Sequence, residues 1–297
     1  MTINGILNTL KPAGQTSFEM VTLVRRLSGQ RRVGHAGTLD RNATGVLPIC
    51  LGQGTRVVEF LVQGEKTYRA QIELGLATDT YDASGRVTRR SDPSTVTREQ
   101  LEQALTSFRG VIEQTPPMYS AVKHQGKPLY LLARAGVEIP RKPRKVHIFS
   151  LEVLEWQPPI FTVEVECSKG TYIRCLAHDL GQKLGCGAHL KSLVRLRSGF
   201  FDIRDGLTVS QLEDAFRYGY WHKLIYSIDQ VLLHMMATIV DVESERAIRN
   251  GRALALGDRK DIDQPEWCRA YSTDGRIIAL LQFQPQKAQW QPAVVFT

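Results

Sequence analysis

The segment Lys66–Leu74, KTYRAQIEL, alternates between apolar and polar side chains along its length. One face carries Tyr68, Ala70, Ile72 and Leu74, and the other carries Thr67, Arg69, Gln71 and Glu73. A period of two indicates a β-strand with one packed face, so Tyr68 is expected on the packed side. Residues 161–167, FTVEVEC, alternate in the same way and predict a second strand.

Helices are signalled as clearly as strands. Thr16–Glu19 and Thr97–Gln100 fit capping boxes, in which the side chains of the first and fourth residues bond backbone N–H groups at a helix start. The turn Ser168–Tyr172 leads into a helix with a buried stripe, and residues 208–219 predict another helix. Strand-like alternation over residues 188–197 places Leu193, Arg195 and Arg197 on one face.

Size and charge bound the class of protein. The 297 residues suffice for one large domain and one small one, and contents of 42% hydrophobic and 23% charged residues are those of a soluble globular protein. The net charge of +8 indicates an anionic partner and leaves nucleic acid and membrane open. No apolar run approaches the roughly 20 residues of a membrane span, and the N-terminus lacks signal-peptide features, so we expect a cytoplasmic protein.

Cysteine usage agrees with a reducing compartment. The five cysteines are scattered and odd in number, which predicts free thiols: Cys50, Cys167, Cys175, Cys186 and Cys268. Cys186 and His189 could supply two zinc ligands, but nothing nearby completes a tetrahedral site, so no metal is expected. The chain has neither a phosphate-binding P-loop nor a Rossmann glycine fingerprint, so no cofactor is expected.

The stretch Arg31–Gly45, RRVGHAGTLDRNATG, which we call the Asp40 loop, is basic and rich in glycine. Asp40 is the only carboxylate between Glu19 and Glu59. Glycines allow a backbone to approach a ligand closely, so a lone acid among cations is a candidate nucleophile acting on a polyanion. The alternative is a turn-forming aspartate whose carboxylate bonds nearby backbone N–H groups.

The pattern G-H-x-G-x-L-D-x-x-A-x-G in this loop resembles the catalytic loop of the TruB family of tRNA pseudouridine synthases. Further segments resemble the family in the same order, over most of residues 5–200: Lys11–Ser17, Lys66–Tyr68, Leu74–Gly75, Thr78–Asp82, Pro116–Lys123 and Cys167–Arg174. The resemblance implies an α+β catalytic domain, residues 1–235, built on a mixed, largely antiparallel sheet flanked by helices. A small, mainly-β, PUA-like RNA-binding domain, residues 236–297, would follow and pack on it, because about 60 residues make a small core.

The resemblance also implies a function. The family flips the uridine at position 55 of the tRNA T loop and isomerises it to pseudouridine without a cofactor. The implied partner is therefore tRNA, and we expect a monomeric enzyme with no membrane contact. Asp40 takes the position of the nucleophile, Arg174 that of its ion-pair partner, and Tyr68 that of the ring lying against the uracil. The substrate-binding positions fall on Lys11, His35, Lys66, Tyr172 and Leu193.

The residues themselves leave alternatives open at these positions. Lys11 could be a solvated lysine, Tyr68 a core tyrosine, Leu193 a core leucine, and His35 a source of a loop-stabilising hydrogen bond. Arg174 is different, because it falls in the first turn of its predicted helix. The positive end of the helix dipole disfavours a cation there, so an acidic partner explains it better.

Residues 115–147, which we call the basic insertion, contain many basic side chains and the single acid Glu138. Among the basic and histidine side chains are Lys123, His124, Lys127, Arg134, Arg141, Lys142, Arg144 and Lys145. Tyr119, Tyr130 and a short helical piece are interleaved with these charges. A charge run is usually solvated surface. The composition also fits an RNA-gripping segment, and the matching family region is a flexible thumb over the tRNA.

One departure from the family pattern follows the nucleophile position. Family members commonly have proline and then a small or apolar residue, whereas this chain has Arg41 and Asn42. Loss of proline should loosen the loop, and Arg41 could gain a phosphate contact. Two other functions compete: an RNA-binding or chaperone protein without chemistry, and a base-excising hydrolase that activates water and releases the base.

Overall fold

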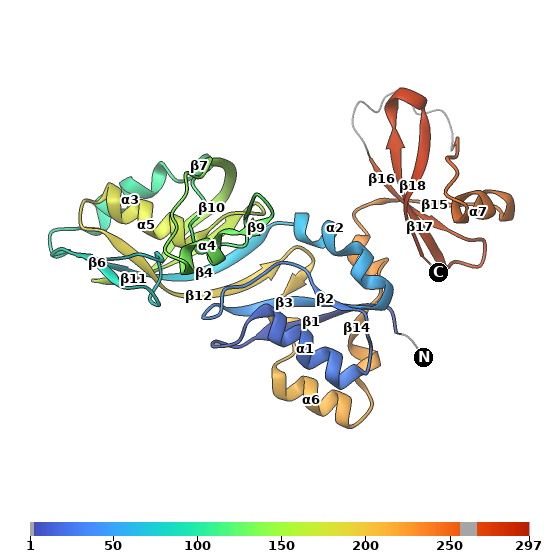
Figure 1. Cartoon of the computed structure of the whole chain (residues 1–297), viewed down its shortest axis with the longest axis horizontal. Coiled ribbons are helices and arrows are strands. Elements are labelled where there is room, and N and C mark those ends of the chain that lie inside the picture. The colour runs from blue at the N-terminus through green and yellow to red at the C-terminus, as the bar shows by residue number, and fades with distance from the viewer. Residues whose placement is uncertain (1–2, 256–265, 297) are drawn as a thin grey trace.

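The structure is a computed structural model that describes residues 3–255 and 266–296, and it contains a ten-stranded sheet and a separate four-stranded sheet (Figure 1). The path through the large sheet is β14-β1-β3-β12-β4-β11-β10-β7, with β13 paired to β12 and β2 to β3. Only β3 and β12 run parallel among these described pairs, so the prediction of a mixed, largely antiparallel sheet is confirmed.

The strands of the large sheet are spread along residues 5–226. They are β1 (Gly5–Lys11), β2 (Val33–His35), β3 (Thr44–Leu51), β4 (Lys66–Leu74), β7 (Gly110–Gln114), β10 (Arg144–Gln157), β11 (Ile160–Cys167), β12 (Ala188–Ser198), β13 (Phe201–Asp202) and β14 (Ile225–Tyr226). Two short hairpins lie outside it, formed by β5 (Leu76–Thr78) with β6 (Val87–Arg90) and by β8 (Lys123–His124) with β9 (Lys127–Pro128).

Alternation in β4 has the predicted consequence. Ala70, Ile72 and Leu74 are buried, whereas Arg69 and Gln71 are exposed. The strand sits between β12 and β11, and its polar face carries cross-strand ion pairs such as Arg69 Nη2–Glu164 Oε2 at 3.2 Å. A central strand therefore presents Tyr68 to the packed side, which confirms that prediction.

Helices cover both faces of the large sheet. One face carries α1 (Ser17–Ser28), α3 (Arg98–Thr106), α5 (Ile173–Lys183) and α6 (Val209–Arg217), and the short helix α2 (Val58–Gln63) packs on the other face of β1 and β3. Both predicted capping boxes are present: Thr16 with Glu19 opens α1, and Thr97 with Gln100 opens α3. Satisfying the first N–H groups in this way fixes where each helix begins.

Two hydrophobic cores meet near the middle of the large sheet. One gathers side chains from α3, α5, β4 and β11, including Leu101, Leu176 and Val163. The other joins α1 to β1 and β3. Tyr68 and Leu193 are half-buried and pack against both cores, so these two side chains lie at the boundary between the halves of the catalytic region.

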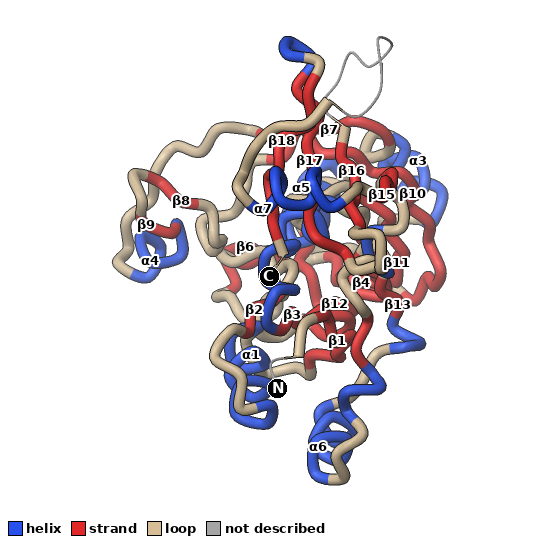
Figure 2. Tube along the Cα trace, turned by 90° about the vertical axis from the view of Figure 1, so that its right-hand side faces the viewer, coloured by secondary structure: helices blue, strands red, loops and turns tan. Residues whose placement is uncertain are grey.

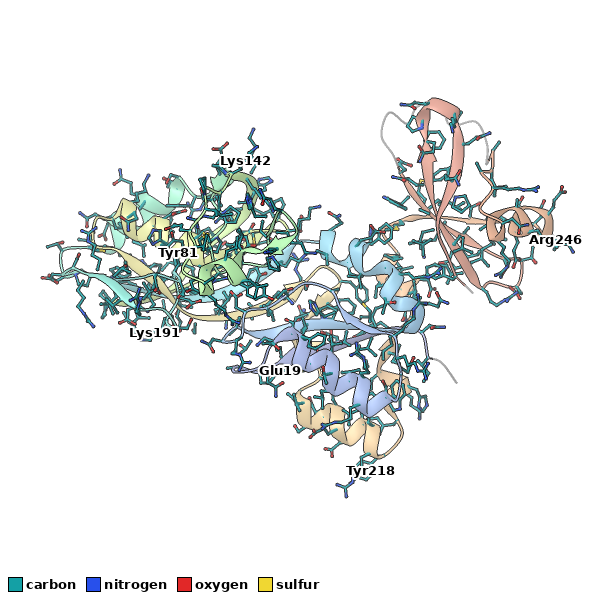
Figure 3. All side chains as sticks on the ribbon, viewed as in Figure 1. Glu19, Tyr81, Lys142, Lys191, Tyr218 and Arg246 are labelled. Carbon is teal, nitrogen blue, oxygen red and sulfur yellow. The ribbon has the colours of Figure 1, made fainter. Side chains whose placement is uncertain are left out.

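The basic insertion leaves the sheet after β7 and returns to it at β10. It contains β8, β9 and the short helix α4 (Leu129–Arg134), and Figure 2 shows these three elements standing apart from the sheet. Figure 3 shows Lys142 pointing outward from this region. The insertion is tied at its base, where Arg141 Nη1 donates to Pro116 O at 3.2 Å.

The C-terminal sheet has its own core and a shared one. It comprises β15 (Met236–Ile239), β16 (Trp267–Tyr271), β17 (Ile277–Gln284) and β18 (Gln289–Val295), with helix α7 (Val242–Arg249) beside it. The predicted turn at residues 273–275 joins β16 to β17. Leu280, Val294 and Phe296 pack with Phe60 of α2 in one cluster, which confirms that the small module packs on the larger one.

The five cysteines are buried and free, as predicted. Within residues 3–255 and 266–296, no helix is long and apolar enough to cross a membrane. The same described residues contain no group of three or more His, Cys, Asp or Glu side chains placed to hold a metal ion.

Candidate active site

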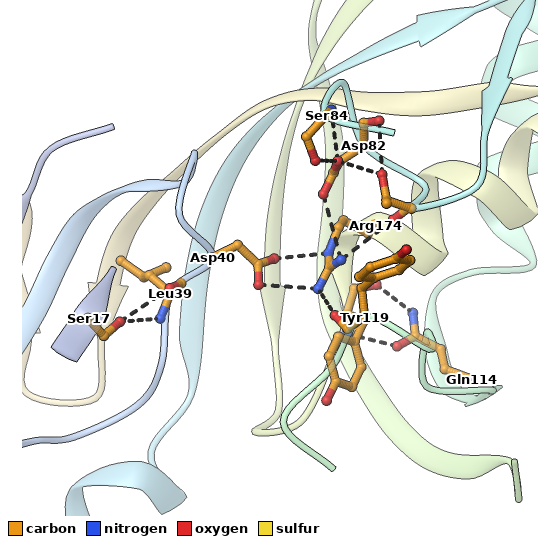
Figure 4. Close-up of polar contacts among 10 residues, drawn as sticks. Ser17, Leu39, Asp40, Asp82, Ser84, Gln114, Tyr119 and Arg174 are labelled. Atoms are coloured by element: carbon orange, nitrogen blue, oxygen red, sulfur yellow. Dashed lines mark hydrogen bonds and ion pairs between the residues drawn. The ribbon is translucent and has the colours of Figure 1, made fainter. Parts of the chain in front are cut away.

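The Asp40 loop contains β2 and runs into the start of β3, and its segment around Asp40 is anchored to the start of α1. Ser17 Oγ accepts from Leu39 N at 2.9 Å and donates to Leu39 O at 3.2 Å (Figure 4). Ala43 N donates to Asp40 O at 3.1 Å and closes a turn. These bonds fix the backbone on both sides of Asp40.

Lys11 also holds the Asp40 loop, through hydrogen bonds to backbone carbonyls next to Asp40 and at the turn before α1. Its buried Nζ donates to Pro12 O, Gln15 O and Arg41 O at 2.8, 2.7 and 3.0 Å. Burial lowers the pKa of Lys11 from 10.5 to about 8, and the charge of Asp40 opposes that shift. Lys11 is therefore a support of the loop and is not among the residues that line the cavity bordered by Asp40.

Arg41 also ties the loop, in place of the proline common in the family pattern. Its Nη1 donates to Gly14 O at 3.0 Å, and its Nη2 lies 3.4 Å from Glu19 Oε1. Gly14 N donates to Arg41 O at 2.9 Å. That the loop is more mobile without proline stays a prediction. The structure shows that several hydrogen bonds hold its backbone in place.

The ion pair predicted between Asp40 and Arg174 is confirmed. Arg174 Nε lies 2.9 Å from Asp40 Oδ2, and Nη2 donates to Oδ1 at 3.2 Å, so the contact is bidentate (Figure 4). Arg174 is the second residue of α5. Its side chain is only 6% exposed, whereas 48% of the Asp40 side chain remains open to the cavity.

A second carboxylate and two carbonyls complete the surroundings of Arg174. Asp82 Oδ2 lies 3.6 Å from Nη1, Tyr119 O accepts from Nη2 at 2.9 Å, and Thr80 O accepts from Nη1 at 3.5 Å (Figure 4). Asp82 is itself held by Thr80 Oγ1 at 2.8 Å and Ser84 N at 2.9 Å. One guanidinium thus joins the Asp40 loop, the loop before β6 and the base of the basic insertion.

Asp40 and Arg174 border a cavity of about 340 Å³. This volume falls in the range of small-ligand sites. The charged side chains in its lining are those of Asp40, Lys66, Lys169, Arg174 and Arg195. Among the sequence-predicted site residues, those that line it are Asp40, Lys66, Tyr68, Tyr172, Arg174 and Leu193. Ser120 and Ala121 also line it, so the root of the basic insertion forms part of the wall.

Tyr68 and Lys66 enter the cavity from the start of β4. Burial raises the pKa of the Tyr68 hydroxyl, and the nearby charge of Arg195 opposes that rise. Lys66 Nζ donates to Val62 O and Gly64 O, and burial lowers its pKa from 10.5 to about 8. At neutral pH the phenol is therefore neutral and the ammonium is charged.

Tyr172 is the residue that precedes α5, and Gln114 of β7 fixes it. Tyr172 N donates to Gln114 Oε1 at 3.0 Å, and Gln114 Nε2 donates to Tyr172 O at 3.2 Å. Burial raises the pKa of the Tyr172 hydroxyl. The two bonds with Gln114 tie the start of α5 to the strand that leads into the basic insertion.

His35 does not join this group. It lies in β2, opposite Ile49 of β3, outside the lining of the cavity. Burial and the charge of Arg195 lower its pKa. Its buried Nδ1 has no hydrogen-bond partner among the residues that the structure describes, so the alternative of a loop-stabilising bond through that atom is wrong.

Burial and Arg174 act on Asp40 in opposite directions. Burial raises the pKa of Asp40 above its ordinary 3.8, the charge of Arg174 lowers it, Asp82 raises it and Lys11 lowers it. The net shift is upward. As expected, the charge of Arg174 favours the ionised form of Asp40. Burial has the larger effect on the pKa and favours the protonated form.

Two residues at the site escaped the sequence analysis, namely Asp82 and Arg195. Asp82 lay in the segment Thr78–Asp82 of the resemblance, without a role. Arg195 was placed on one face with Arg197, which is wrong: the β12–β4 register shifts between these residues. Arg195 lines the cavity, whereas Arg197 pairs with Glu166 on the polar face.

A carboxylate beside a guanidinium, with an aromatic ring in the same base-sized cavity, suits attack on an electrophilic carbon or stabilisation of a cation. A family model described as the N-terminal domain of TruB family pseudouridylate synthases matches residues 25–173. The chain belongs to the TruB family of pseudouridylate synthases. A second model, described as the C-terminal domain of tRNA pseudouridylate synthase B, matches residues 174–240.

Relatives of this family match almost the whole chain. A tRNA pseudouridine synthase B of Dehalococcoides mccartyi (strain ATCC BAA-2100 / JCM 16839 / KCTC 5957 / BAV1) is 46% identical, over 99% of this chain and 97% of its own. One from Heliobacterium modesticaldum (strain ATCC 51547 / Ice1) is 42% identical over 99% and 96%. In a crystal structure of a Cbf5–Nop10–Gar1 complex, one chain is similar with a TM-score of 0.75 and 27% identity, over 99% of this chain and 84% of that one.

Proposed function

We propose that this TruB-family enzyme converts the uridine at position 55 of the tRNA T loop to pseudouridine, with Asp40 as nucleophile and no cofactor. The names of its relatives support tRNA as the substrate. The observation that carries the proposal is the bidentate Asp40–Arg174 contact at the edge of a cavity that Tyr68 also lines. This arrangement supplies a fixed carboxylate and a flat aromatic face in one space.

The reaction is a rearrangement of one nucleotide. The N1–C1′ bond breaks, the base turns, a C5–C1′ bond forms, and the proton lost from C5 is replaced by one on N1. Asp40 would attack carbon or assist loss of the base, while Arg174 orients it, and attack on the base, attack on the ribose and a glycal route all remain open. Tyr68 would stack on the everted uracil, replacing the stacking lost from the RNA, and help remove the C5 proton.

The remaining residues would position the substrate. Lys66, Tyr172 and Leu193 line the cavity and would contact the flipped nucleotide, His35 would fill space near it, and Lys11 would support the loop. The basic insertion, residues 115–147, would hold the T arm through phosphate contacts that do not read sequence. We place the catalytic domain at residues 1–235 and a PUA-like RNA-binding domain at 236–297, in a cytoplasmic, monomeric enzyme.

The test is an incubation of the protein with T-arm RNA, followed by nucleoside analysis. Pseudouridine at the target position supports the proposal. Unchanged uridine would indicate an RNA-binding protein without chemistry, and an abasic site with free uracil would indicate a hydrolase. Mapping pseudouridine in tRNA from cells lacking the protein checks the position independently.

A further inference from the structure

Arg195 is a buried cation in the cavity to which the mechanism above gives no role. Its side chain is 1% exposed and is the bulkiest of the fully buried side chains in the described residues. It forms no ion pair with any carboxylate in residues 3–255 and 266–296, whereas Arg174 contacts two. A buried arginine is rarely left without a counter-ion, because moving the charge out of water costs several kcal/mol.

The fold fixes this guanidinium in one orientation. Arg195 Nε donates to Val46 O at 2.7 Å, and Nη2 donates to Gly37 O at 3.0 Å. The backbone of Arg195 pairs with Gly45, where φ is +98° and an added Cβ would lie 2.2 Å from Arg195 O. Only glycine lets β3 and β12 approach so closely, so the position of the arginine is built into the sheet.

Arg195 stands next to Tyr68 at the cavity. Arg195 lies directly opposite Tyr68 in the β12–β4 ladder, and both side chains line the cavity. The charge of Arg195 lowers the pKa of the Tyr68 hydroxyl, against the rise that burial causes. Of the five N–H donors of an arginine, the carbonyls of Val46 and Gly37 occupy two, which leaves donors for a ligand in the cavity.

The charges of Arg195 and Arg174 affect the pKa values of different groups around the cavity. The charge of Arg195 shifts the pKa values of Tyr68, Lys66, Lys11 and His35 downward. The charges that shift the pKa of Asp40 belong to Arg174, Asp82 and Lys11. Arg174 is therefore the cation beside the carboxylate, and Arg195 is a cation beside the aromatic ring.

Pseudouridine formation needs positive charge on the side of the ring. When the N1–C1′ bond breaks, its electron pair stays with the base, which becomes a uracil anion until C5 bonds to C1′ and the C5 proton is exchanged for one on N1. We propose that Arg195 is the electrostatic stabiliser of this detached uracil, acting through its fixed charge beside Tyr68. The inference rests on the proposed function, since it concerns the same reaction.

The competing explanation is structural, because Arg195 also ties the Asp40 loop to the sheet. A substrate with an altered base separates the two. Fluorine at C5 withdraws electrons and stabilises a uracil anion by itself, so a T-arm RNA with 5-fluorouridine at the target position depends less on protein charge. A structural defect would slow uridine and 5-fluorouridine by the same factor.

The experiment compares Arg195→Met with the wild-type enzyme in single turnover, measuring disappearance of the starting nucleoside from each RNA. We expect the rate for uridine to fall by ~10²-fold, as for loss of one preorganised donor. The rate for 5-fluorouridine should fall by a clearly smaller factor, with RNA affinity unchanged. Arg195→Gln, which keeps donors but no charge, replaces the methionine variant if that variant does not fold.

Arg269 provides a matched control. It is also a buried arginine, 7% exposed, and it bonds a backbone carbonyl, Met235 O, and a tyrosine hydroxyl, Tyr271, but in the C-terminal sheet. Arg269→Met should leave both rates unchanged. Equal slowing of the two substrates by Arg195→Met, or no slowing of uridine, would overturn the inference. Wild-type enzyme that makes no pseudouridine would instead refute the proposed function.

Discussion

Two arginines border the same cavity in opposite electrostatic settings. Arg174, from α5, lies between the carboxylates of Asp40 and Asp82, at 2.9 and 3.6 Å. Arg195, from β12, is fixed by two carbonyls and lies beside Tyr68. A charge that must orient a resting carboxylate is paired before substrate arrives, whereas a charge meant for a transient anion gains most when it is left unpaired.

The two arginines differ in their partners because they come from different elements, Arg174 from helix α5 and Arg195 from strand β12. Arg174 sits at the start of a helix, where the dipole makes a cation unfavourable and two acids offset it. Arg195 sits in a central strand, where backbone carbonyls can bond a guanidinium but cannot neutralise it. One side of the cavity, which we call the balanced wall, has Arg174 paired with Asp40 and Asp82. The other side, which we call the unpaired wall, has Arg195 beside Tyr68 and no carboxylate paired with it among the described residues.

The largest effect should come from the balanced wall. Asp40→Asn keeps the shape of the side chain but removes the nucleophile, so pseudouridine formation should fall by roughly 10⁴-fold or more, as for loss of a catalytic nucleophile. Single-turnover nucleoside analysis measures it, with deamidation back to aspartate excluded by mass. Asp79→Asn, which removes a carboxylate paired with the exposed Arg86, is the matched control and should be nearly neutral. Appreciable turnover by Asp40→Asn would reject Asp40 as nucleophile.

Loss of Arg174 should affect stability as well as catalysis. Arg174→Met leaves Asp40 and Asp82 facing one another without a cation, which should cost about 3 kcal/mol in the free energy of unfolding, the low end for a broken buried pair because Asp40 is half-open to the cavity. Arg174→Lys should recover part of the stability but not the bidentate geometry. Denaturant unfolding and single-turnover rates check both. Loss of activity at unchanged stability would mean that the pair is not structural.

Much of the balanced wall could be predicted from sequence, because its signals are local. Asp40 was the lone acid in a basic, glycine-rich loop, and Arg174 was a cation where a helix start disfavours one. The capping boxes of α1 and α3 were readable for the same reason. Asp82 was not, since an acid in a polar turn has a local explanation, and its carboxylate does accept from Ser84 N within that turn.

The unpaired wall was hidden by an irregularity of the sheet. Simple alternation put Arg195 and Arg197 on the same face, but the register shift between them turns Arg197 toward Glu166 and leaves Arg195 inside. A bulge is set by the pairing of β12 with β4 and β3, which are far away in sequence, so a period-two pattern cannot reveal it. Burial of a charged side chain is likewise a tertiary property.

The pH dependence of turnover should separate the two walls. The acid limb should lie above pH 3.8, because burial raises the pKa of Asp40 and the nucleophile must be ionised. The folded state holds that proton more tightly than the unfolded chain does, so ionising Asp40 lowers stability as the pH rises through this range. The alkaline limb should lie near pH 8, where Lys66 and Lys11 lose their charges.

A single variant sharpens this assignment. Lys66→Arg keeps a cation at all accessible pH values, so the alkaline limb should move upward if Lys66 sets it. The acid limb should stay in place, because the charges that shift Asp40 do not include Lys66. Rates measured from pH 4 to 10 give both limbs. An alkaline limb still near pH 8 would assign it to Lys11, whose neutral amine has too few N–H groups for its three carbonyl acceptors.

The smallest effect on chemistry should come from the charges of the basic insertion, none of which lines the cavity. Neutralising Lys142, Arg144 and Lys145 together should weaken RNA binding and flatten its salt dependence, by a slope of about 2 if each cation meets a phosphate of single-stranded RNA. The rate at saturating RNA should change little, because the cavity is lined by Ser120 and Ala121 and not by these three residues. Binding titrations over a range of salt concentrations measure the slope. A fall in the saturated rate with an unchanged slope would mean that the insertion acts on the walls of the cavity and that its charges face only water.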